Sequence, residues 1–408
     1  MSVHPWISLS IIFLTLTGVA MGRYPGLRMN RATIALVGAT LLIIVGAISL
    51  EKAYHAIDMN TIVLLFSMMV LNINLRLAGF FNLVVNQVAG IAKNTRQLLF
   101  LVIMSAGILS ALFLNDTVVI MFTPLVLEVT LALKRNPIPY LMGLATAANV
   151  GSAATIIGNP QNMLIGMSSQ ISFVSFAYYL APVALAGLVV VYLVIITVYR
   201  KEFNGQRLNY HALIPPRVFK PLLYKSAISL TLMLIAFVAG AQIPLAALGA
   251  ASLLLITRRI KPQRVFTELD WALLIFFSGL FVVTHAIETS GLGVVLFAQA
   301  NPLIHQGLAS LAVVSALLSN GISNVPAVLL FRSLMNTFSD PKLAWLTLAM
   351  ATTFAGNLTL LGSVANLIVA ESAKSKGIQL SFGEYLKAGV PITVLSLAIG
   401  ICWFYMIE

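Results

Sequence analysis

Apolar residues in this chain form long continuous runs that are interrupted by short polar or basic segments. The runs from Ala32 to Leu50 and from Val183 to Val198 are examples, and they approach the roughly 20 residues that a membrane-spanning helix needs. These runs are continuous rather than alternating, whereas the strands of a membrane β-barrel alternate between apolar and polar side chains. The pattern therefore predicts an all-α polytopic membrane protein.

The amino-acid composition supports the prediction of a polytopic membrane protein. Hydrophobic residues make up 60% of the 408 positions and charged residues only 9%, whereas a soluble domain has about 25% charged residues. This apolar content is enough for roughly ten to twelve spanning helices, which excludes a soluble enzyme with a single anchor. Cys402 is the only cysteine, so an intrachain disulfide or thiolate metal site is excluded. We expect neither a metal nor a cofactor.

The formal charge of +12 is explained by topology rather than by nucleic-acid binding, because the basic residues cluster in short loops. Loops rich in Lys and Arg stay on the cytoplasmic side of a membrane. The predicted cytoplasmic markers are Arg23, Arg28, Arg31, Lys93, Arg96, Lys134, Arg135, Arg200, Lys201, Arg258, Arg259, Lys374 and Lys376. They predict a protein of the cytoplasmic (inner) membrane with both termini external.

These markers divide the chain into a first helix with its cytoplasmic loop (1–31), a first repeat (32–200), a cytoplasmic linker (201–225) and a second repeat (226–408). Each repeat is predicted to contain five spanning helices and one re-entrant hairpin. The hairpins cover about 97–133 and 307–337, and helices broken at mid-membrane cover about 137–168 and 343–371. Polar backbone at membrane depth is tolerated only where it lines a cavity or is buried in protein.

The two halves carry the same motifs. The pattern Thr-x-x-Gly-x-x-x-Asn begins at Thr155 and again at Thr359, 204 residues later. The hairpin tips match as Asn115 and Asn324, 209 residues apart. An odd number of crossings in each half makes the second repeat inverted relative to the first. Inverted repeats with broken helices are an architecture of secondary transporters, which bind substrate at the midplane.

At these motifs the chain resembles the ion transporter superfamily, in particular its arsenite permease and sodium/proton antiporter branch. The segments that carry the resemblance are Leu114-Asn115-Asp116-Thr117 with Pro124, Gly158-Asn159-Pro160-Gln161-Asn162, Ser323-Asn324-Val325-Pro326, and Gly356-Asn357-Leu358-Thr359 with Gly362, Ser363 and Asn366. It covers nearly the whole chain. The resemblance implies a transporter, suggests a homodimer and allows an ATPase subunit as a partner. Val325 replaces the threonine usual in divalent anion/sodium symporters, which argues against symporter-type sodium sites.

The polar tips should converge on one substrate site, where side chains and helix ends supply neutral donors and acceptors. The predicted substrate-binding residues are Asn115, Thr117, Thr155, Asn159, Asn162, Ser323, Asn324, Asn357, Thr359, Ser363 and Asn366. The alternative is that these side chains only cap broken helices. Asp116 is a carboxylate deep in the membrane, which is by default functional. We predict that it couples transport to protons or cations, with Arg332 as its partner; a purely structural ion pair is the alternative.

A site of neutral groups suits a small uncharged polyhydroxy solute better than a divalent anion. Together with the resemblance, which carries most of this inference, the site predicts export of arsenite and antimonite, in exchange for protons. Sodium/proton antiport and transport of an inorganic or organic anion remain alternatives. A membrane enzyme is disfavoured, since no His/Glu/Asp metal set or Ser/His pair lies at the tips. Because all tip motifs belong to the hairpins and broken helices, these segments should move together against a scaffold, as in an elevator.

Overall fold

The computed structural model describes residues 5–22, 24, 26–204, 218–257, 261–289, 301–304 and 306–407. These residues form helices and no strand. Seven helices are long and apolar enough to cross a membrane: α4 (Met59–Leu77), α6 (Thr95–Leu112), α7 (Asn115–Ala132), α10 (Phe173–Val198), α11 (Lys220–Val238), α14 (Trp271–Thr289) and α21 (Phe382–Ile407). Shorter apolar helices are α1 (Pro5–Met21), α2 (Arg31–Ile44), α5 (Phe80–Ile91), α12 (Ile243–Leu255) and α17 (Leu308–Ile322). The predicted all-α polytopic class is confirmed.

Several elements of the second half match elements of the first in order and length. Helices α4 and α14 both have 19 residues. Helices α10 and α21 both have 26 residues, and each contains one internal proline, Pro182 and Pro391. The short helices α3 (Leu50–Ala56) and α13 (Pro262–Thr267) occupy matching places. The repeated motifs are thus accompanied by repeated elements, and the inverted orientation remains a prediction.

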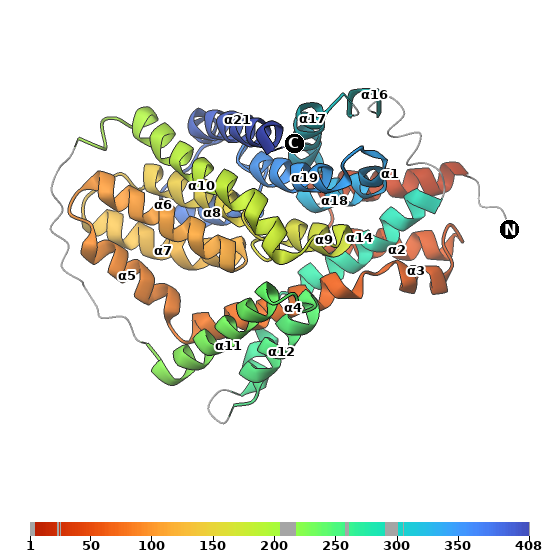
Figure 1. Ribbon diagram of the computed structural model, residues 1–408, viewed down its shortest axis with the longest axis horizontal. Helices are drawn as coiled ribbons and strands as arrows, with labels where there is room; N and C mark the ends of the chain where they lie inside the picture. Colours follow the sequence, from red (N-terminus) through yellow and green to blue (C-terminus); the bar gives the residue numbers. More distant parts are fainter. Residues whose placement is uncertain are drawn as a thin grey trace.

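Contacts between the halves are reciprocal. Helix α4 packs against α12, and their counterparts α14 and α2 pack against each other. Helix α10 packs against α21, while α7 contacts α20 (Val364–Ser375) and α9 (Pro160–Ser169) contacts α18 (Asn324–Phe331). In Figure 1, α4, α11 and α12 lie along one edge, and α6, α7, α8 and α10 form a separate group. Each half therefore buries surfaces that the other half supplies.

The predicted hairpins and broken helices appear as pairs of helices. Helices α6 and α7 meet at Phe113 and Leu114, and α17 meets α18 at Ser323. Helix α18 continues as the 3-10 helix η1 (Arg332–Thr337). The breaks separate α8 (Pro137–Ser152) from α9, and α19 (Pro341–Ala355) from α20. Since α6 and α7 each have 18 residues, their re-entrant form stays a prediction.

Local sequence explains the first break. A Cβ atom on Gly158 would lie 2.3 Å from the carbonyl oxygen of Ser152, so only glycine lets the chain fold back this closely. Asn159 then caps α9 by accepting a hydrogen bond from the Asn162 backbone, and Pro160 stands in the first turn, a residue preference common at helix starts. The second break has the matching cap, Ser363, at the start of α20.

Large apolar side chains cover the outer faces of the helices. On α10, Leu185, Val189 and Leu193 are each more than half exposed, at 53, 54 and 56%. Exposed apolar surface of this extent is unusual in soluble monomers and is what lipid contact requires. The sidedness of the chain is not tested in the same way, because several segments on which it was predicted lie outside the described residues. These are Arg23, Arg258, Arg259, residues 205–217 of the predicted linker, and residues 290–300 and 305. The external termini remain a prediction.

Candidate functional site

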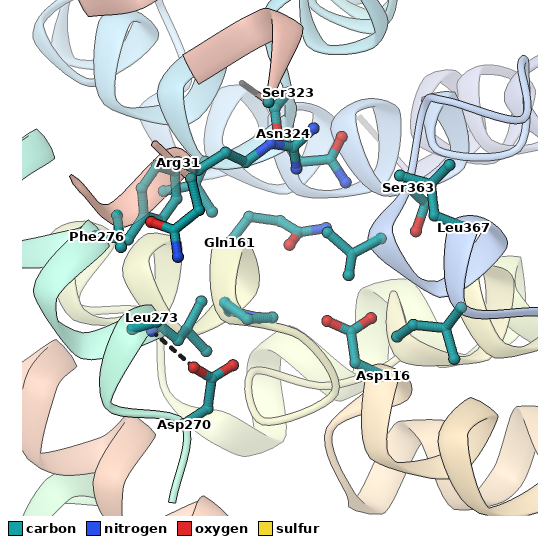
Figure 2. A pocket seen from close by; sticks show the side chains of 18 of the residues that line it. Arg31, Asp116, Gln161, Asp270, Leu273, Phe276, Ser323, Asn324, Ser363 and Leu367 are labelled. Carbon is teal, nitrogen blue, oxygen red and sulfur yellow. Dashed lines mark hydrogen bonds between the residues drawn. The ribbon is translucent and has the colours of Figure 1, made fainter. Parts of the chain in front are cut away.

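Six helices begin at the wall of one cavity of about 420 Å³ (Figure 2). The lining residues at these helix starts are Asn30 and Arg31 (α2), Asn115 and Asp116 (α7), Pro160 and Gln161 (α9), Asp270 and Ala272 (α14), Asn324 and Val325 (α18), and Ser363 and Val364 (α20). The first turn of a helix carries backbone N–H groups without helical partners and a partial positive charge. The cavity is therefore suited to a ligand rich in oxygen.

The two matched asparagines, Asn115 and Asn324, both line this cavity. Asn115 Nδ2 donates to Asn149 Oδ1 at 3.2 Å, while its Oδ1 is buried and has no hydrogen-bond partner among the described residues. Asn324 Oδ1 accepts a hydrogen bond from Ser319 Oγ at 2.7 Å, which leaves its Nδ2 as a donor for a ligand.

Ser323, at the second tip, has a strained backbone with φ 83° and ψ 153°. Residues other than glycine rarely adopt this conformation, which costs on the order of 1–3 kcal/mol and is concentrated at functional sites. Ser323 lines the cavity directly before α18. Its conformation supports a functional role for this tip.

Asp116 projects into the cavity, and the charges acting on it are those of Asp270 and Arg31. In Figure 2, Asp116 and Asp270 occupy one side of the cavity, and Arg31 and Asn324 the other. The predicted pairing with Arg332 is wrong, because Arg332 begins η1 and is exposed. The arginine near Asp116 comes instead from the start of α2, which sequence spacing could not reveal.

The structure brings five of the predicted site residues to the cavity wall: Asn115, Asp116, Ser323, Asn324 and Ser363. Six others lie beneath it and line neither this cavity nor the one described below: Thr155, Asn159, Asn162, Asn357, Thr359 and Asn366. Their contacts are those of the capping alternative.

The contacts of Asn162 and Asn366 repeat between the halves. Asn162 Nδ2 donates to the carbonyl oxygens of Ser152 and Thr155, both at 3.1 Å. Asn366 Nδ2 donates to the carbonyl oxygens at the same offsets, Gly356 at 2.7 Å and Thr359 at 3.2 Å. Both asparagines thus satisfy backbone groups that the helix breaks leave free.

Sequence reasoning missed Asn149 and Thr353, which join the two breaks. Asn149 Nδ2 donates to Asn357 Oδ1 at 2.8 Å and to Asn366 Oδ1 at 3.1 Å, and its Oδ1 accepts from Ser363 Oγ at 3.0 Å. Thr353 Oγ1 in turn accepts from Asn159 Nδ2 at 3.3 Å. The two residues are 204 positions apart, which is the spacing of the repeat. Two polar residues at matching positions within apolar runs were the signal that could have identified them from the sequence.

A second cavity of about 140 Å³ adjoins the first and shares Asp116, Pro160, Asp270 and Leu273 with it. Thr117 lines this second cavity, together with Asn72 and Arg76 of α4. Arg76 forms an ion pair with Glu268, which follows α13. Among the described residues, no group of three or more His, Cys, Asp or Glu side chains is placed to hold a metal ion.

The sequence matches a family model described as a citrate transporter over residues 12–355. The chain belongs to this family. It is 33% identical to the silicon efflux transporter LSI3 of Oryza sativa subsp. japonica, with 92% of this chain and 93% of that protein aligned. A Dictyostelium discoideum protein, provisionally named transporter arsB, is 26% identical over 98% of this chain and 92% of its own. Membership confirms the predicted ion transporter superfamily.

Solved structures show the same fold. The YdaH transporter of Alcanivorax borkumensis superposes with a TM-score of 0.62 at 13% identity, covering 99% of this chain and 98% of its own. MtrF of Neisseria gonorrhoeae, described as one of a class of antimetabolite efflux pumps, gives 0.61 at 14% identity, covering 99% and 95%. Family membership and the long apolar helices make the chain a multi-pass membrane transporter.

Proposed function

We propose that the chain is a secondary active transporter of the cytoplasmic membrane that exports arsenite and antimonite in exchange for protons. Both substrates are small, uncharged hydroxides near neutral pH. The observation that carries the proposal is the cavity of six helix starts, whose lining also includes amide and carboxylate side chains. A hydroxide whose O–H groups both donate and accept can use both kinds of partner.

Charge in the cavity argues against a citrate-like substrate, despite the name of the family. Among the described residues, the lining includes three carboxylates, Asp116, Asp270 and Glu371, and one arginine, Arg31. A tricarboxylate anion would meet more negative than positive groups, and a binding site rejects ligands whose charge it leaves unpaired. An uncharged solute meets no such penalty. The names of the silicon efflux and arsB relatives fit this preference.

In the proposed cycle, Asn115, Ser323, Asn324 and Ser363 bind the substrate, and Asp116 carries the exchanged proton. Protonation must change the affinity for substrate, since coupling between two ligands requires that each alters the binding of the other. The six residues beneath the cavity hold the broken helices that present these groups. Thr117 belongs to the second cavity.

The inverted repeats supply two facing states, and the tip-bearing helices α6 to α10 and α17 to α21 move as the elevator. The cavity wall includes Gly22, Asn30 and Glu371, which lie beside segments predicted to be cytoplasmic. We infer from these neighbours that this state faces inward, ready to load substrate for export. The remaining helices form the scaffold, through which we expect a homodimer.

Silicic acid is a second candidate substrate. The relative with 33% identity is named as a silicon efflux transporter, and silicic acid is also a small, uncharged hydroxide at neutral pH. Its four hydroxyl groups could use the same N–H groups and oxygens.

The test is uptake into everted vesicles or proteoliposomes with an imposed pH gradient. Arsenite, antimonite, silicic acid, sodium and citrate are compared in parallel without ATP. We expect gradient-dependent accumulation of the hydroxides and none of citrate. Citrate uptake without hydroxide uptake would overturn the proposal, and hydroxide uptake only in the presence of ATP and a second subunit would assign the driving force to an ATPase.

A further inference from the structure

Asp116 lies on the wall of two cavities. The first is the proposed substrate cavity, and the second extends from Asp116 and Thr117 to the ion pair of Arg76 with Glu268. At about 140 Å³, the second cavity has room for several water molecules, since one needs roughly 10–15 Å³ of such space. The side chains of Arg76 and Glu268 are about one-third exposed, at 32 and 27%. This cavity thus connects the tip carboxylate with a group near the surface.

The second cavity has a polar lining that the fold alone does not require. Asn72 is 1% exposed, and its Nδ2 makes a long contact of 3.5 Å to Thr117 Oγ1. Its Oδ1 is buried and has no hydrogen-bond partner among the described residues. A buried amide oxygen without a partner costs on the order of 1–3 kcal/mol, so its position calls for a ligand such as water.

We propose that the second cavity is the route by which the proton leaves Asp116 in this state, separate from the route of the substrate. This inference rests on the proposed proton exchange. The carboxyl group of Asp116 gives its proton to water in the second cavity and becomes a carboxylate. The proton then passes out beside Arg76 and Glu268. A separate route matters in an exchanger, because substrate that enters the first cavity would otherwise block the departing proton.

The charged groups around Asp116 agree with this division. Arg31 and Glu371 line only the first cavity, Arg76 and Glu268 line only the second, and Asp270 lines both. Glu268 pairs with both Arg76 and Arg264 at the outer end of the second cavity, and Asp270 adds a further carboxylate to its lining. Asn72 lies on α4 between the pair of Arg76 with Glu268 and Asp116. An apolar side chain at this one position can therefore interrupt a chain of water molecules.

The test uses purified protein in proteoliposomes with two measurements, arsenite transport driven by a pH gradient and arsenite–arsenite exchange without a gradient. Only the first needs proton release in each cycle. Asn72→Leu should lower the gradient-driven rate at least tenfold and leave the exchange rate and its half-saturating concentration within twofold. Asn72→Ala leaves the cavity open to water and should retain most gradient-driven transport.

Asn74→Leu is the matched control. Asn74 lies on the same helix and is equally buried, at 1% exposed, but its amide donates within the helix to the carbonyl oxygen of Val70 at 2.8 Å. It lines neither cavity. We expect this variant to behave like the parent in both measurements.

Each other outcome is decisive. Equal loss of gradient-driven transport in Asn72→Ala and Asn72→Leu would show that Asn72 acts structurally, through its contact with Thr117. That result would overturn the proposed proton route. A raised half-saturating concentration in exchange would make the second cavity part of the substrate site. Failure of Asn72→Leu to fold while Asn72→Ala transports poorly would also count against it. A parent that exchanges neither arsenite nor silicic acid would instead overturn the proposed function.

Discussion

Asparagine and aspartate at membrane depth carry out two different tasks in this chain. Asn115 and Asp116 face the cavity, whereas Asn162 and Asn366 hydrogen-bond to backbone carbonyl groups freed by the breaks. Residue type and spacing identified both groups from the sequence. They could not separate them, because the direction of a side chain is set by the fold around it.

Asp116→Asn keeps the shape of the tip and most of its hydrogen bonding but cannot exchange a proton. We expect this variant to bind arsenite with an affinity close to that of the parent, while gradient-driven accumulation is lost. Equilibrium binding and vesicle uptake measure the two properties separately. If the variant accumulated substrate with the parental dependence on the pH gradient, the coupling group would have to be another residue.

Asn149→Ala should destabilise the protein more than any tip variant. It removes the partner of Asn115, Asn357, Asn366 and Ser363 at once, and stranded buried polar groups cost about 1–3 kcal/mol each. We expect a total loss of at least about 3 kcal/mol, seen as a clear fall in the melting temperature in detergent.

The control for that loss is Asn82→Ala, at an exposed position on α5. It should leave the melting temperature nearly unchanged. Equal shifts in the two variants would show that the Asn149 network contributes little to stability.

At the scale of elements, local signals predicted the breaks well and non-local pairs poorly. Gly158, Asn159 and Pro160 specify the first break within three consecutive residues. The ion pair between Arg76 and Glu268 joins residues 192 positions apart, and Arg31 reaches Asp116 from a different helix. The residues around each charge do not indicate which distant residue pairs with it. The fold was therefore needed to replace Arg332 by Arg31 as the arginine near Asp116.

The crossing of α6 and α8 depends on two glycines. A Cβ atom on Gly151 would lie 2.2 Å from the carbonyl oxygen of Gly107, and close approach of backbones through small residues is typical of membrane helices. Gly151→Ala should therefore force the helices apart and lower the melting temperature by several degrees, because the clash is with backbone and cannot relax by a rotamer change.

Gly90→Ala gives the matched comparison. Gly90 lies on α5 with nothing within 4 Å of the added Cβ atom, and alanine favours a helix by up to about 1 kcal/mol over glycine. This variant should be as stable as the parent or slightly more stable. A Gly151→Ala variant with the same behaviour would contradict the close crossing.

For the whole molecule, the sequence predicted the repeat through matched motifs, and the reciprocal contacts of α4 with α12 and of α14 with α2 agree with it. Charge clusters predicted sidedness, which depends on how the loops lie relative to the bilayer. Relative movement is equally beyond the sequence, because two facing states use the same residues. Both matters therefore need measurement in vesicles.

An elevator moves one wall of the cavity across the membrane and leaves the other in place. Leu367 on α20 and Ala272 on α14 line the same cavity from the proposed moving and static parts. In a Cys402→Ser background, which removes the one native thiol, Leu367→Cys should react with an impermeant thiol reagent from both faces of the membrane. Substrate and the pH gradient should change the ratio of the reaction rates from the two faces, since they shift the populations of the two states.

Ala272→Cys should react from the cytoplasmic face alone. Equal reactivity of both cysteines from both faces would instead indicate that the two walls rock about a fixed site.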